Sequence, residues 1–407
     1  STKLLAARLA WAVTPSSSAI RSPANQEVMN RNVRSFLVLS ANTPWVYALA
    51  ESLGRDVPVH AVRIYDWRTY WAQSPTWPEV PEGVDLRQTM KALPPGYAGP
   101  LEPVVRPYLR SLLRQWQDDL EAHSGTRPWV IAPYFHLAPW VIPDVPSDRL
   151  VYYNLDEYTQ YRPERAETIR SQETHLVENA ACTVCLARHQ VETLRHRHPE
   201  QDDRIHHFPL GVDERYINPD PTTPPTPKTV GYVGNLSDRV DWFFVRDVAD
   251  QCPDLQFVFA GSAPGEVPDD APEWKKVRQA VFSMSNVRHL GRIPQEEVTE
   301  VYWSCAVNWI PYDAEHPFNV ASCPTKVMDT IASGRPIVST PVPECTLYPE
   351  WIEVVGEPDA ASSSLHDAVS SSRPPSGTRA QVQFAQTQTW DDRAHELLNI
   401  LDGIHVT

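Results

Sequence analysis

Short apolar runs alternate with segments of helical periodicity through the first half of the chain. The runs that predict buried strands cover residues 35–40, 57–65, 129–132, 150–154, 182–187 and 206–210. Between them, apolar residues recur at helical spacing over residues 46–53, 104–123, 162–179 and 189–197. This alternation is typical of a parallel sheet that helices cover on both faces.

The same alternation restarts after a stiff segment, residues 219–227, in which five of nine residues are proline. Predicted strands then cover 229–233, 255–260, 287–290, 307–310, 336–339 and 353–355, and predicted helices cover 240–251, 295–304, 324–333 and 382–401. We therefore predict an α/β protein with two Rossmann-like, doubly wound domains that face a cleft. The expected parts are a domain over 1–218, a linker over 219–227, a domain over 228–385 and a closing helix over 386–407.

Two segments do not fit this alternation. Residues 66–105 are rich in proline and tryptophan and show no clear period, so we interpret them as a long irregular insertion at the surface. Residues 3–13 are apolar but short and interrupted by Arg8, which favours a surface or amphipathic helix over a signal peptide. A contact of this segment with a membrane surface stays open, and no segment of the chain is predicted to span a membrane.

Composition excludes some classes of protein. The 36 Lys and Arg residues against 51 Asp and Glu residues give a formal net charge of −15, which disfavours a nucleic-acid-binding protein. Neither a G-x-G-x-x-G nor a P-loop motif occurs, which disfavours dehydrogenases and kinases. Cys182 and Cys185 lie in an apolar run with no second CxxC, so we predict a buried strand rather than a zinc or redox site.

A loop that leads into a predicted helix carries the strongest chemical signal. Ser322-Cys-Pro-Thr-Lys326 follows an apolar strand, and Pro324 suits the first turn of a helix. The amides of Thr325 and Lys326 would then point out of a helix N-terminus, which favours an anion. A lysine opposes the helix dipole there, so we interpret Lys326 as a ligand for a negative group. Asp329 lies one turn later on about the same face, where a carboxylate can accept bonds from sugar hydroxyls.

These residues belong to a stretch that resembles the donor-binding motif of glycosyltransferases with the GT-B fold. Residues 324–338 follow the pattern P-x-K-x-x-E-x-x-A-x-G-x-P-V-V, with Asp329 in place of the glutamate. Residues 210–219, 231–241, 255–261, 287–294, 151–158 and 384–393 resemble other parts of the same family in the same order. The resemblance is to the bacterial exopolysaccharide, or group 1, glycosyltransferases, including an inverting branch that resembles glucuronosyltransferases. It implies that the first domain binds the acceptor, that the second binds a nucleotide-sugar donor, and that the last helix returns to the first domain.

The resemblance also implies roles for single residues on the donor side. Lys326 would contact the donor diphosphate with help from Thr325, and Asp329 would bind the ribose. Tyr312 would approach the nucleotide base. In addition, the Gly234-Asn235 turn would approach the diphosphate, with Arg239 assisting.

One departure bears on stereochemistry. Many retaining members carry a glutamate eight residues before the helix carboxylate, where this chain has Ala321, so inverting and retaining transfer both stay open. Asp156 matches the acidic motif of the inverting branch, and both Asp156 and Glu157 follow an apolar strand. Inverting transfer needs one base to deprotonate the acceptor hydroxyl. Adjacent carboxylates on extended chain point opposite ways, so only one of the two can serve, unless they merely cap a helix.

The chain is therefore expected to move a sugar from a nucleotide diphosphate sugar, with uridine as the expected nucleoside, to a hydroxyl of a glycan or lipid-linked glycan in polysaccharide or glycoconjugate biosynthesis. No D-x-D motif occurs, so we expect a metal-independent enzyme without a cofactor, in the cytoplasm or at the inner membrane face. The alternatives are a nucleotide-sugar epimerase of the same fold and a non-catalytic glycan-binding subunit. Asn42, after the first strand, could touch donor or acceptor, or cap a helix.

Overall fold

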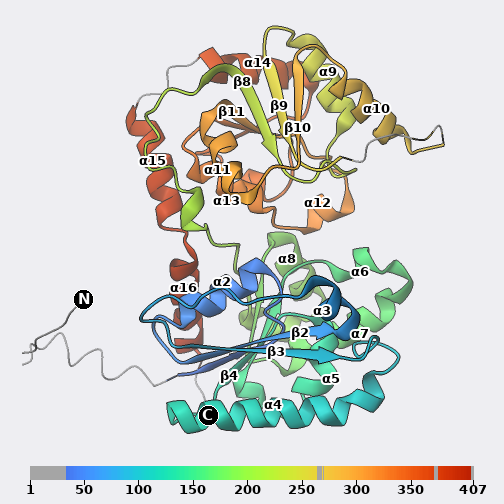
Figure 1. Cartoon of the computed structure of the whole chain (residues 1–407), viewed down its shortest axis with the longest axis vertical. Helices are drawn as coiled ribbons and strands as arrows, with labels where there is room; N and C mark the ends of the chain where they lie inside the picture. The colour runs from blue at the N-terminus through green and yellow to red at the C-terminus, as the bar shows by residue number, and fades with distance from the viewer. Residues whose placement is uncertain (1–33, 264–267, 269, 371–374, 405–407) are drawn as a thin grey trace, which may run out of the picture. The chain divides into compact units, whose positions relative to one another are not determined.

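The computed structural model describes residues 34–404, apart from 264–267, 269 and 371–374. Residues 34–407 form one compact unit. The segment 3–13, predicted as a surface helix, lies outside the described residues. Two parallel sheets organise the described chain (Figure 1).

The first sheet has seven parallel strands in the order β3-β2-β1-β4-β5-β6-β7. The strands are β1 (Phe36–Val38), β2 (Val59–Asp66), β3 (Leu86–Leu93), β4 (Trp129–Ala132), β5 (Leu150–Asn154), β6 (Cys182–Cys185) and β7 (Ile205–His207). Every residue of β1, β4, β5 and β6 is buried, as continuous apolar runs predict for a sheet covered on both faces. Cys182 and Cys185 are therefore buried strand residues, as predicted.

Helices cover both faces of this sheet. They are α2 (Pro44–Leu53), α3 (Trp67–Gln73), α4 (Glu102–Ser124), α5 (Ala138–Val141), α6 (Tyr158–Tyr161), α7 (Ala166–Asn179) and α8 (Arg188–Arg197). Phe36 and Val38 of β1 share a core with α2, whereas Leu37 between them faces α4, α5, α7 and α8 (Figure 1). The alternation of side chains along a strand thus supplies two separate cores.

The second sheet has six parallel strands in the order β10-β9-β8-β11-β12-β13. They are β8 (Thr226–Val233), β9 (Gln256–Ala260), β10 (Val287–Gly291), β11 (Cys305–Ile310), β12 (Ile337–Ser339) and β13 (Ile352–Val354). Its helices are α9 (Trp242–Gln251), α10 (Glu273–Phe282), α11 (Gln295–Ser304), α12 (Pro317–Ala321), α13 (Thr325–Ala332), α14 (Pro358–Ser370) and α15 (Pro375–Gln386). The order of the strands in both sheets is that of doubly wound α/β domains, so the predicted fold class is confirmed.

The last helix, α16 (Trp390–Asp402), packs against the first sheet rather than the second. Its Leu397 and Leu401 are fully buried in the core that holds β1 and α2. Arg34 at the start of the described chain also pairs with Asp402, with 2.7 Å between their charged atoms. The chain therefore crosses between the two sheets twice, once near residue 220 and once between α15 and α16.

Two predictions about the elements were wrong. Residues 66–105 are not irregular, because they form α3 and β3, and β3 pairs with β2 over eight residues. The closing segment 382–401 is not one helix, because Thr389 caps α16 through a hydrogen bond from the Asp392 backbone and so separates it from α15. Among the described residues, no helix is both long and apolar enough to cross a bilayer.

Candidate active site

Helix α13 begins at the edge of a pocket, and its N-terminus has no side-chain cap. Pro324 is the N-cap residue, so the helix starts one residue later than predicted, at Thr325. The first-turn N–H groups that lack a helical partner are therefore available to a ligand. A positive φ of 71° at Gly334 follows the last residues of the helix, as is common for a glycine just past a helix C-terminus.

Lys326 is held by aromatic rings and by close backbone. Its ammonium nitrogen lies 5.3 Å from the ring centres of both Tyr232 and Tyr312. A Cβ atom at Gly234 would displace this ammonium group, and the φ of 147° at Gly234 is a backbone conformation that favours glycine. Within the described residues, no carboxylate lies within ion-pairing distance of Lys326. The cation is therefore fixed in place without a negative partner.

A hollow of about 350 Å³ opens in front of these groups. We call it the α13 pocket, and five predicted donor-site residues line it: Gly234, Asn235, Thr325, Lys326 and Asp329. The other lining residues are Tyr216, Val233, Ala260, Gly261, Ser262, Arg292, Ile293, Gln295, Val298 and Tyr302. Strand ends of the second sheet and the start of α13 thus converge on one space, as expected for a parallel sheet.

Asp329 has a strongly perturbed carboxyl group. Burial raises its pKa to about 7, with the negative charge of Asp213 adding to the effect and the positive charges of Lys326 and Arg215 opposing it. Near neutral pH the Asp329 carboxyl group therefore occurs in both protonation states. A polar ligand that offers hydroxyl donors would favour the ionised form.

Tyr312 and Arg239 lie behind Lys326 rather than on the pocket wall. Tyr312 is almost fully buried, and although burial opposes it, the positive charges of Lys326 and Arg239 hold the pKa of Tyr312 below its usual range. Arg239 donates to Asn319 Oδ1 at 2.8 Å and to Ser322 Oγ at 2.9 Å. Both residues therefore support the lysine and its loop, and their predicted contacts with a nucleotide stay predictions.

Asp156 and Glu157 follow β5, as predicted, but neither lines the α13 pocket. Asp156 accepts hydrogen bonds from the Glu157 backbone N–H at 2.9 Å and from the Tyr161 hydroxyl. Burial raises the pKa of Asp156, opposed by these bonds and by the charge of Arg239. Glu157 caps α6 by accepting hydrogen bonds from Thr159. The two carboxylates thus differ in role: Glu157 is committed to capping, whereas Asp156 lies within the electrostatic reach of Arg239.

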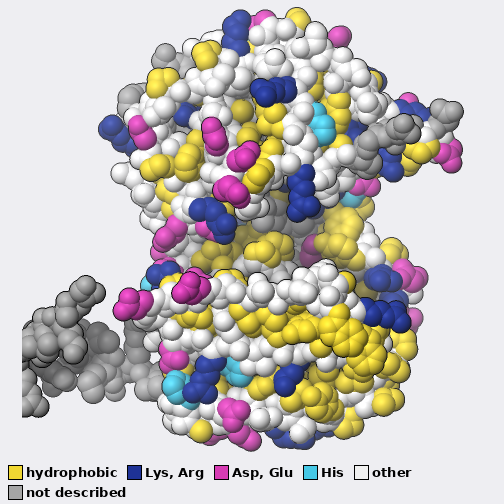
Figure 2. All heavy atoms as spheres, viewed as in Figure 1, with side chains coloured by type: hydrophobic (Ala, Val, Ile, Leu, Met, Phe, Trp, Pro, Cys, Tyr) yellow, Lys and Arg dark blue, Asp and Glu magenta, His cyan; other side chains and the backbone are white. Residues whose placement is uncertain are grey.

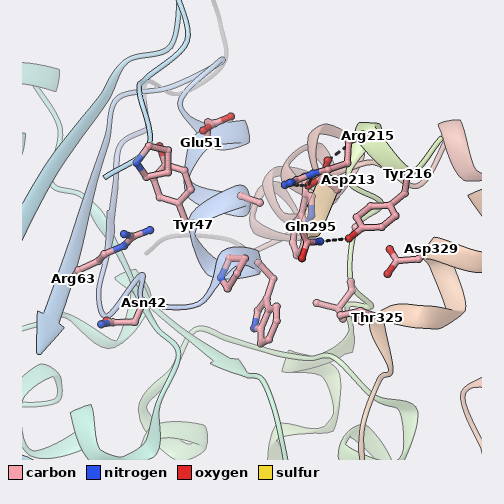
Figure 3. A pocket seen from close by; sticks show the side chains of 17 residues that line it. Asn42, Tyr47, Glu51, Arg63, Asp213, Arg215, Tyr216, Gln295, Thr325 and Asp329 are labelled. Atoms are coloured by element: carbon pink, nitrogen blue, oxygen red, sulfur yellow. Dashed lines mark hydrogen bonds and ion pairs between the residues drawn. The ribbon is translucent and has the colours of Figure 1, made fainter. Parts of the chain in front are cut away.

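A second hollow, of about 600 Å³, adjoins the α13 pocket (Figure 3). We call it the α2 pocket, and it shares Tyr216, Gln295, Thr325 and Asp329 with the α13 pocket. Its other lining residues are Asn42, Pro44, Trp45, Tyr47, Ala48, Glu51, Arg63, Pro78, Leu210, Gly211, Asp213, Arg215 and Trp390. Asn42, one of the weaker sequence candidates, does face this space, and its amide also bonds the Ile64 carbonyl at 3.0 Å.

Sequence reasoning missed the fixed cation of the α2 pocket, Arg63. Its guanidinium lies 4.1 Å from the centre of the Trp77 ring, and it donates to the carbonyls of Ala41 and Thr76 at 2.9 Å each. Arg63 lies within β2, a strand predicted as apolar, where one charged residue gives no sign that it faces a ligand. The Asp213–Arg215 pair was also missed, although Asp213 belongs to the quoted stretch 210–219.

Comparison with known proteins agrees with this geometry. Residues 227–368 match the family model described as glycosyl transferases group 1. The chain is 22% identical over 186 residues to a protein of Bacillus subtilis named as a teichuronic acid biosynthesis glycosyltransferase, TuaH. That match covers 44% of this chain and 45% of TuaH, so the chain spans less than half the length of this curated relative.

Solved structures extend the likeness to both sheets. The UDP complex of Alr3699/HepE from Anabaena has a TM-score of 0.60 at 12% identity, covering 91% of this chain and all of that one. Sucrose-phosphate synthase from Thermosynechococcus elongatus has a TM-score of 0.59 at 18% identity, covering 91% and 98%. A UDP-forming trehalose-phosphate synthase from Burkholderia xenovorans has a TM-score of 0.61 at 10% identity, covering 92% and 100%.

At these identities the solved structures establish the fold alone, and the family model matches residues 227–368, which hold the second sheet. The described cluster of Lys326, Gly234 and Asp329 lies inside the matched region. The predicted resemblance is confirmed: the chain has the two-domain GT-B fold, and its residues 227–368 match the group 1 glycosyl transferases.

Proposed function

We propose that this protein is a glycosyltransferase that takes a sugar from a nucleotide diphosphate sugar, with uridine as the nucleoside, and transfers it to a hydroxyl group. One observation carries the proposal. The ammonium of Lys326 has no acidic partner among the described residues and lies beside the uncapped N-terminus of α13 and the Gly234 turn, whose backbone conformation favours glycine. A fixed ammonium group and free backbone N–H groups that lie side by side can together bind a diphosphate.

The donor would lie across the α13 pocket. Its diphosphate would take the amides of the first helical turn, the Lys326 ammonium and the Gly234-Asn235 backbone. Asp329, one turn along α13, would accept hydrogen bonds from ribose hydroxyls, and this favours its ionised form over the neutral one. Negative charge builds on the leaving nucleotide diphosphate during transfer, so a preorganised cation stabilises the transition state more than the ground state.

Tyr312 and Arg239 would act as positioning residues. The Lys326 ammonium lies 5.3 Å from the centre of the Tyr312 ring, and the Arg239 guanidinium lies 5.4 Å from the centre of the same ring. Hydrogen bonds to Asn319 and Ser322 hold Arg239 in this position. These contacts restrict the lysine side chain before any ligand arrives. Preorganisation of this kind reduces the conformational entropy that binding would otherwise cost.

The α2 pocket would receive the acceptor. It adjoins the α13 pocket and supplies about 600 Å³ next to the shared residues Thr325 and Asp329. An epimerase acts on the donor alone and needs no such second space, so this pocket favours transfer over epimerisation. The acceptor itself, a glycan or lipid-linked glycan of polysaccharide biosynthesis, is proposed in line with the name of the TuaH relative.

For the chemical step we propose inverting transfer with Asp156 as base. The acceptor oxygen would attack the anomeric carbon, the bond from that carbon to the phosphate oxygen would break, and the electron pair would remain on the nucleotide diphosphate. The hydroxyl proton would move to Asp156, which lines neither pocket, so the acceptor hydroxyl would have to extend from the α2 pocket to this carboxylate. Burial raises the pKa of Asp156 and so makes it a stronger base. The Tyr161 hydroxyl that now bonds Asp156 would have to yield one carboxylate oxygen to the acceptor.

Calorimetry with UDP and a panel of UDP-sugars tests the proposal first. We expect saturable binding by the parent protein and a marked loss in the K326A variant. Failure of the parent to bind any nucleotide would favour a non-catalytic glycan-binding subunit. Interconversion of UDP-sugars in the absence of acceptor, followed by chromatography, would identify the epimerase instead. Transfer to a glycan or lipid-linked glycan, with inversion seen by NMR of the product, is the outcome that supports the full proposal.

A further inference from the structure

A buried arginine lies behind the loop that follows β8. Arg278 belongs to α10 and is only 1% exposed, and its guanidinium donates a hydrogen bond to the Leu236 carbonyl at 2.6 Å. Leu236 comes directly after the Gly234-Asn235 turn, which lines the α13 pocket. Arg278 itself lines neither the α13 pocket nor the α2 pocket. Its contact with the proposed donor site therefore runs through this loop.

The carbonyl groups of residues 235–237 in this loop are each held by a buried side chain. The Tyr232 hydroxyl donates to the first carbonyl at 2.9 Å, and the Trp242 indole donates to the third at 2.8 Å. Arg278 holds the middle one. Within the described residues, the N–H groups of residues 235–237 have no hydrogen-bond partner. The loop thus gives its carbonyls to donors in the protein interior and leaves its N–H groups available to a ligand.

The Arg278 guanidinium makes poor use of its hydrogen-bonding capacity. Its Nε and Nη2 atoms are buried without a hydrogen-bond partner, and among the described residues no carboxylate lies within ion-pairing distance of it. The Trp274 ring, with its centre 5.2 Å away, is an aromatic neighbour of the guanidinium. Burial lowers the pKa of Arg278, as expected for a cation that has lost water without gaining a negative partner.

Arg278 differs in this respect from the cations at the surface. Figure 2 shows Lys and Arg side chains on the outside of the upper half, where water screens their charge. A buried cation without a negative partner is costly for folding, and an apolar side chain of similar volume would fill the same space without that cost. Packing alone therefore does not explain an arginine at this position, whereas a negative ligand beside the loop would.

We propose that Arg278 is a positioning residue for the diphosphate of the donor. It holds the Leu236 carbonyl in the interior, so that the N–H groups of residues 235–237 are presented to the phosphates. Its positive charge lies on the far side of the same loop, and in an interior that excludes water this charge acts on the phosphates across the loop. The inference rests on the proposed function, because it needs a diphosphate in the α13 pocket.

Arg278 and Lys326 would thus serve the same diphosphate in different ways. Lys326 would contact a phosphate directly, whereas Arg278 would act through the loop. Negative charge grows on the leaving nucleotide diphosphate during transfer, so a fixed positive charge behind the loop should raise kcat as well as donor affinity. The KM for the acceptor should not depend on Arg278.

The affinities of UDP and uridine, compared in the full-length protein, test the proposal. Calorimetry gives the affinity for UDP, and displacement of UDP gives that for uridine, which has the nucleoside but no phosphate. Arg278→Met should lower the ratio of UDP affinity to uridine affinity roughly tenfold, the effect of one lost charge-assisted contact. In a transfer assay the same variant should lower kcat and leave the acceptor KM as in the parent.

Two variants serve as matched controls. Lys276→Met removes the same charge from an exposed position of α10. Asn286→Leu removes a buried side chain that also donates to backbone carbonyls, those of Ala249 and Cys252, outside both pockets. Both variants should keep the parent's ratio of UDP to uridine affinity. If Arg278→Met does not fold, Arg278→Gln replaces it, since glutamine lacks the charge but remains polar, and its ratio should also fall.

The outcomes separate this inference from the proposed function. If the parent binds UDP and the folded Arg278 variant keeps the parent's ratio of UDP to uridine affinity, the positioning role is overturned and the proposed function stands. An equal fall in that ratio in the Asn286→Leu variant would overturn it too, because any loss of packing in the domain would then have the same effect. A parent that binds no UDP would refute the proposed function itself, and the role of Arg278 with it.

Discussion

Replacement of Lys326 by alanine tests the centre of the proposed donor site. The ammonium stands 5.3 Å from two aromatic ring centres, beside the uncapped start of α13, and it has no carboxylate partner among the described residues. Its expected partner is therefore a ligand phosphate. A charge-assisted hydrogen bond of this kind contributes about 1.5–3 kcal/mol. K326A should accordingly bind UDP roughly 10- to 150-fold more weakly than the parent, and kcat should also fall because charge grows on the leaving group.

The same variant should fold with nearly unchanged stability. A cation at a helix N-terminus costs about 0.3–1 kcal/mol, and the contacts of the ammonium with the Tyr232 and Tyr312 rings return about 0.5–1 kcal/mol at a partly exposed site. These two contributions nearly cancel, so the midpoint of urea unfolding should hardly move. If K326A loses affinity for UDP while its urea unfolding midpoint stays unchanged, the loss results from the binding site and not from a destabilised fold.

Two further variants help to interpret the result of this experiment. Lys326→Arg should rescue UDP binding only in part, because a planar guanidinium does not replace a compact ammonium. Lys276→Ala removes an exposed lysine from α10 of the same domain and serves as the matched control for net charge. If K326A bound UDP as tightly as K276A does, the diphosphate would not lie at α13, and the reasoning from the helix terminus would be refuted.

Three other outcomes follow from the described site. Asp156→Asn should leave UDP binding unchanged and lower turnover roughly 10²- to 10⁴-fold in a transfer assay; normal turnover would remove Asp156 from the mechanism. Asp329 has a folded-state pKa raised to about 7, so the stability linked to its proton is complete below about pH 4 and is lost as the pH rises through 7. Asp329→Asn should therefore unfold at nearly equal denaturant concentrations at pH 5 and pH 8, whereas the ligand-free parent should be weaker at pH 8; a parallel decline in both proteins would contradict the assigned pKa. Transfer should persist in EDTA, since Lys326 and the α13 amides supply the positive charge; loss that only a divalent ion restores would contradict this account.

The sheets could be predicted because their strands are buried on both sides. Runs such as Phe36–Val38 and Leu150–Asn154 hold apolar residues at successive positions, and few other structures use such a run. The pocket in front of α13 could be predicted for a related reason, since strand ends of one parallel sheet meet at one edge. The position of a residue at a strand end does not, however, specify how deeply its side chain is buried. Tyr312 is buried against Lys326 and does not line the α13 pocket, because only packing decides which side of the lysine a neighbouring ring occupies.

The α2 pocket was beyond sequence reasoning for a different reason. Its wall combines Arg63 from within β2, Trp390 from the last helix and Asp213 from the connection between the sheets. Each of these residues has an ordinary local explanation, and only their meeting in space makes a binding surface. Acceptor sites of this composite kind carry no local spacing signal, in contrast to the compact motif around Lys326.

The misreading of residues 66–105 has a physical cause. Strand β3 is an edge strand in which only Leu86 and Leu93 are buried, so it lacks the apolar run by which a strand is recognised. Helix α3 buries nothing, so it lacks the apolar stripe by which a helix is recognised. Trp67 and Trp71 therefore contribute nothing to the core, although large apolar side chains in water favour aggregation.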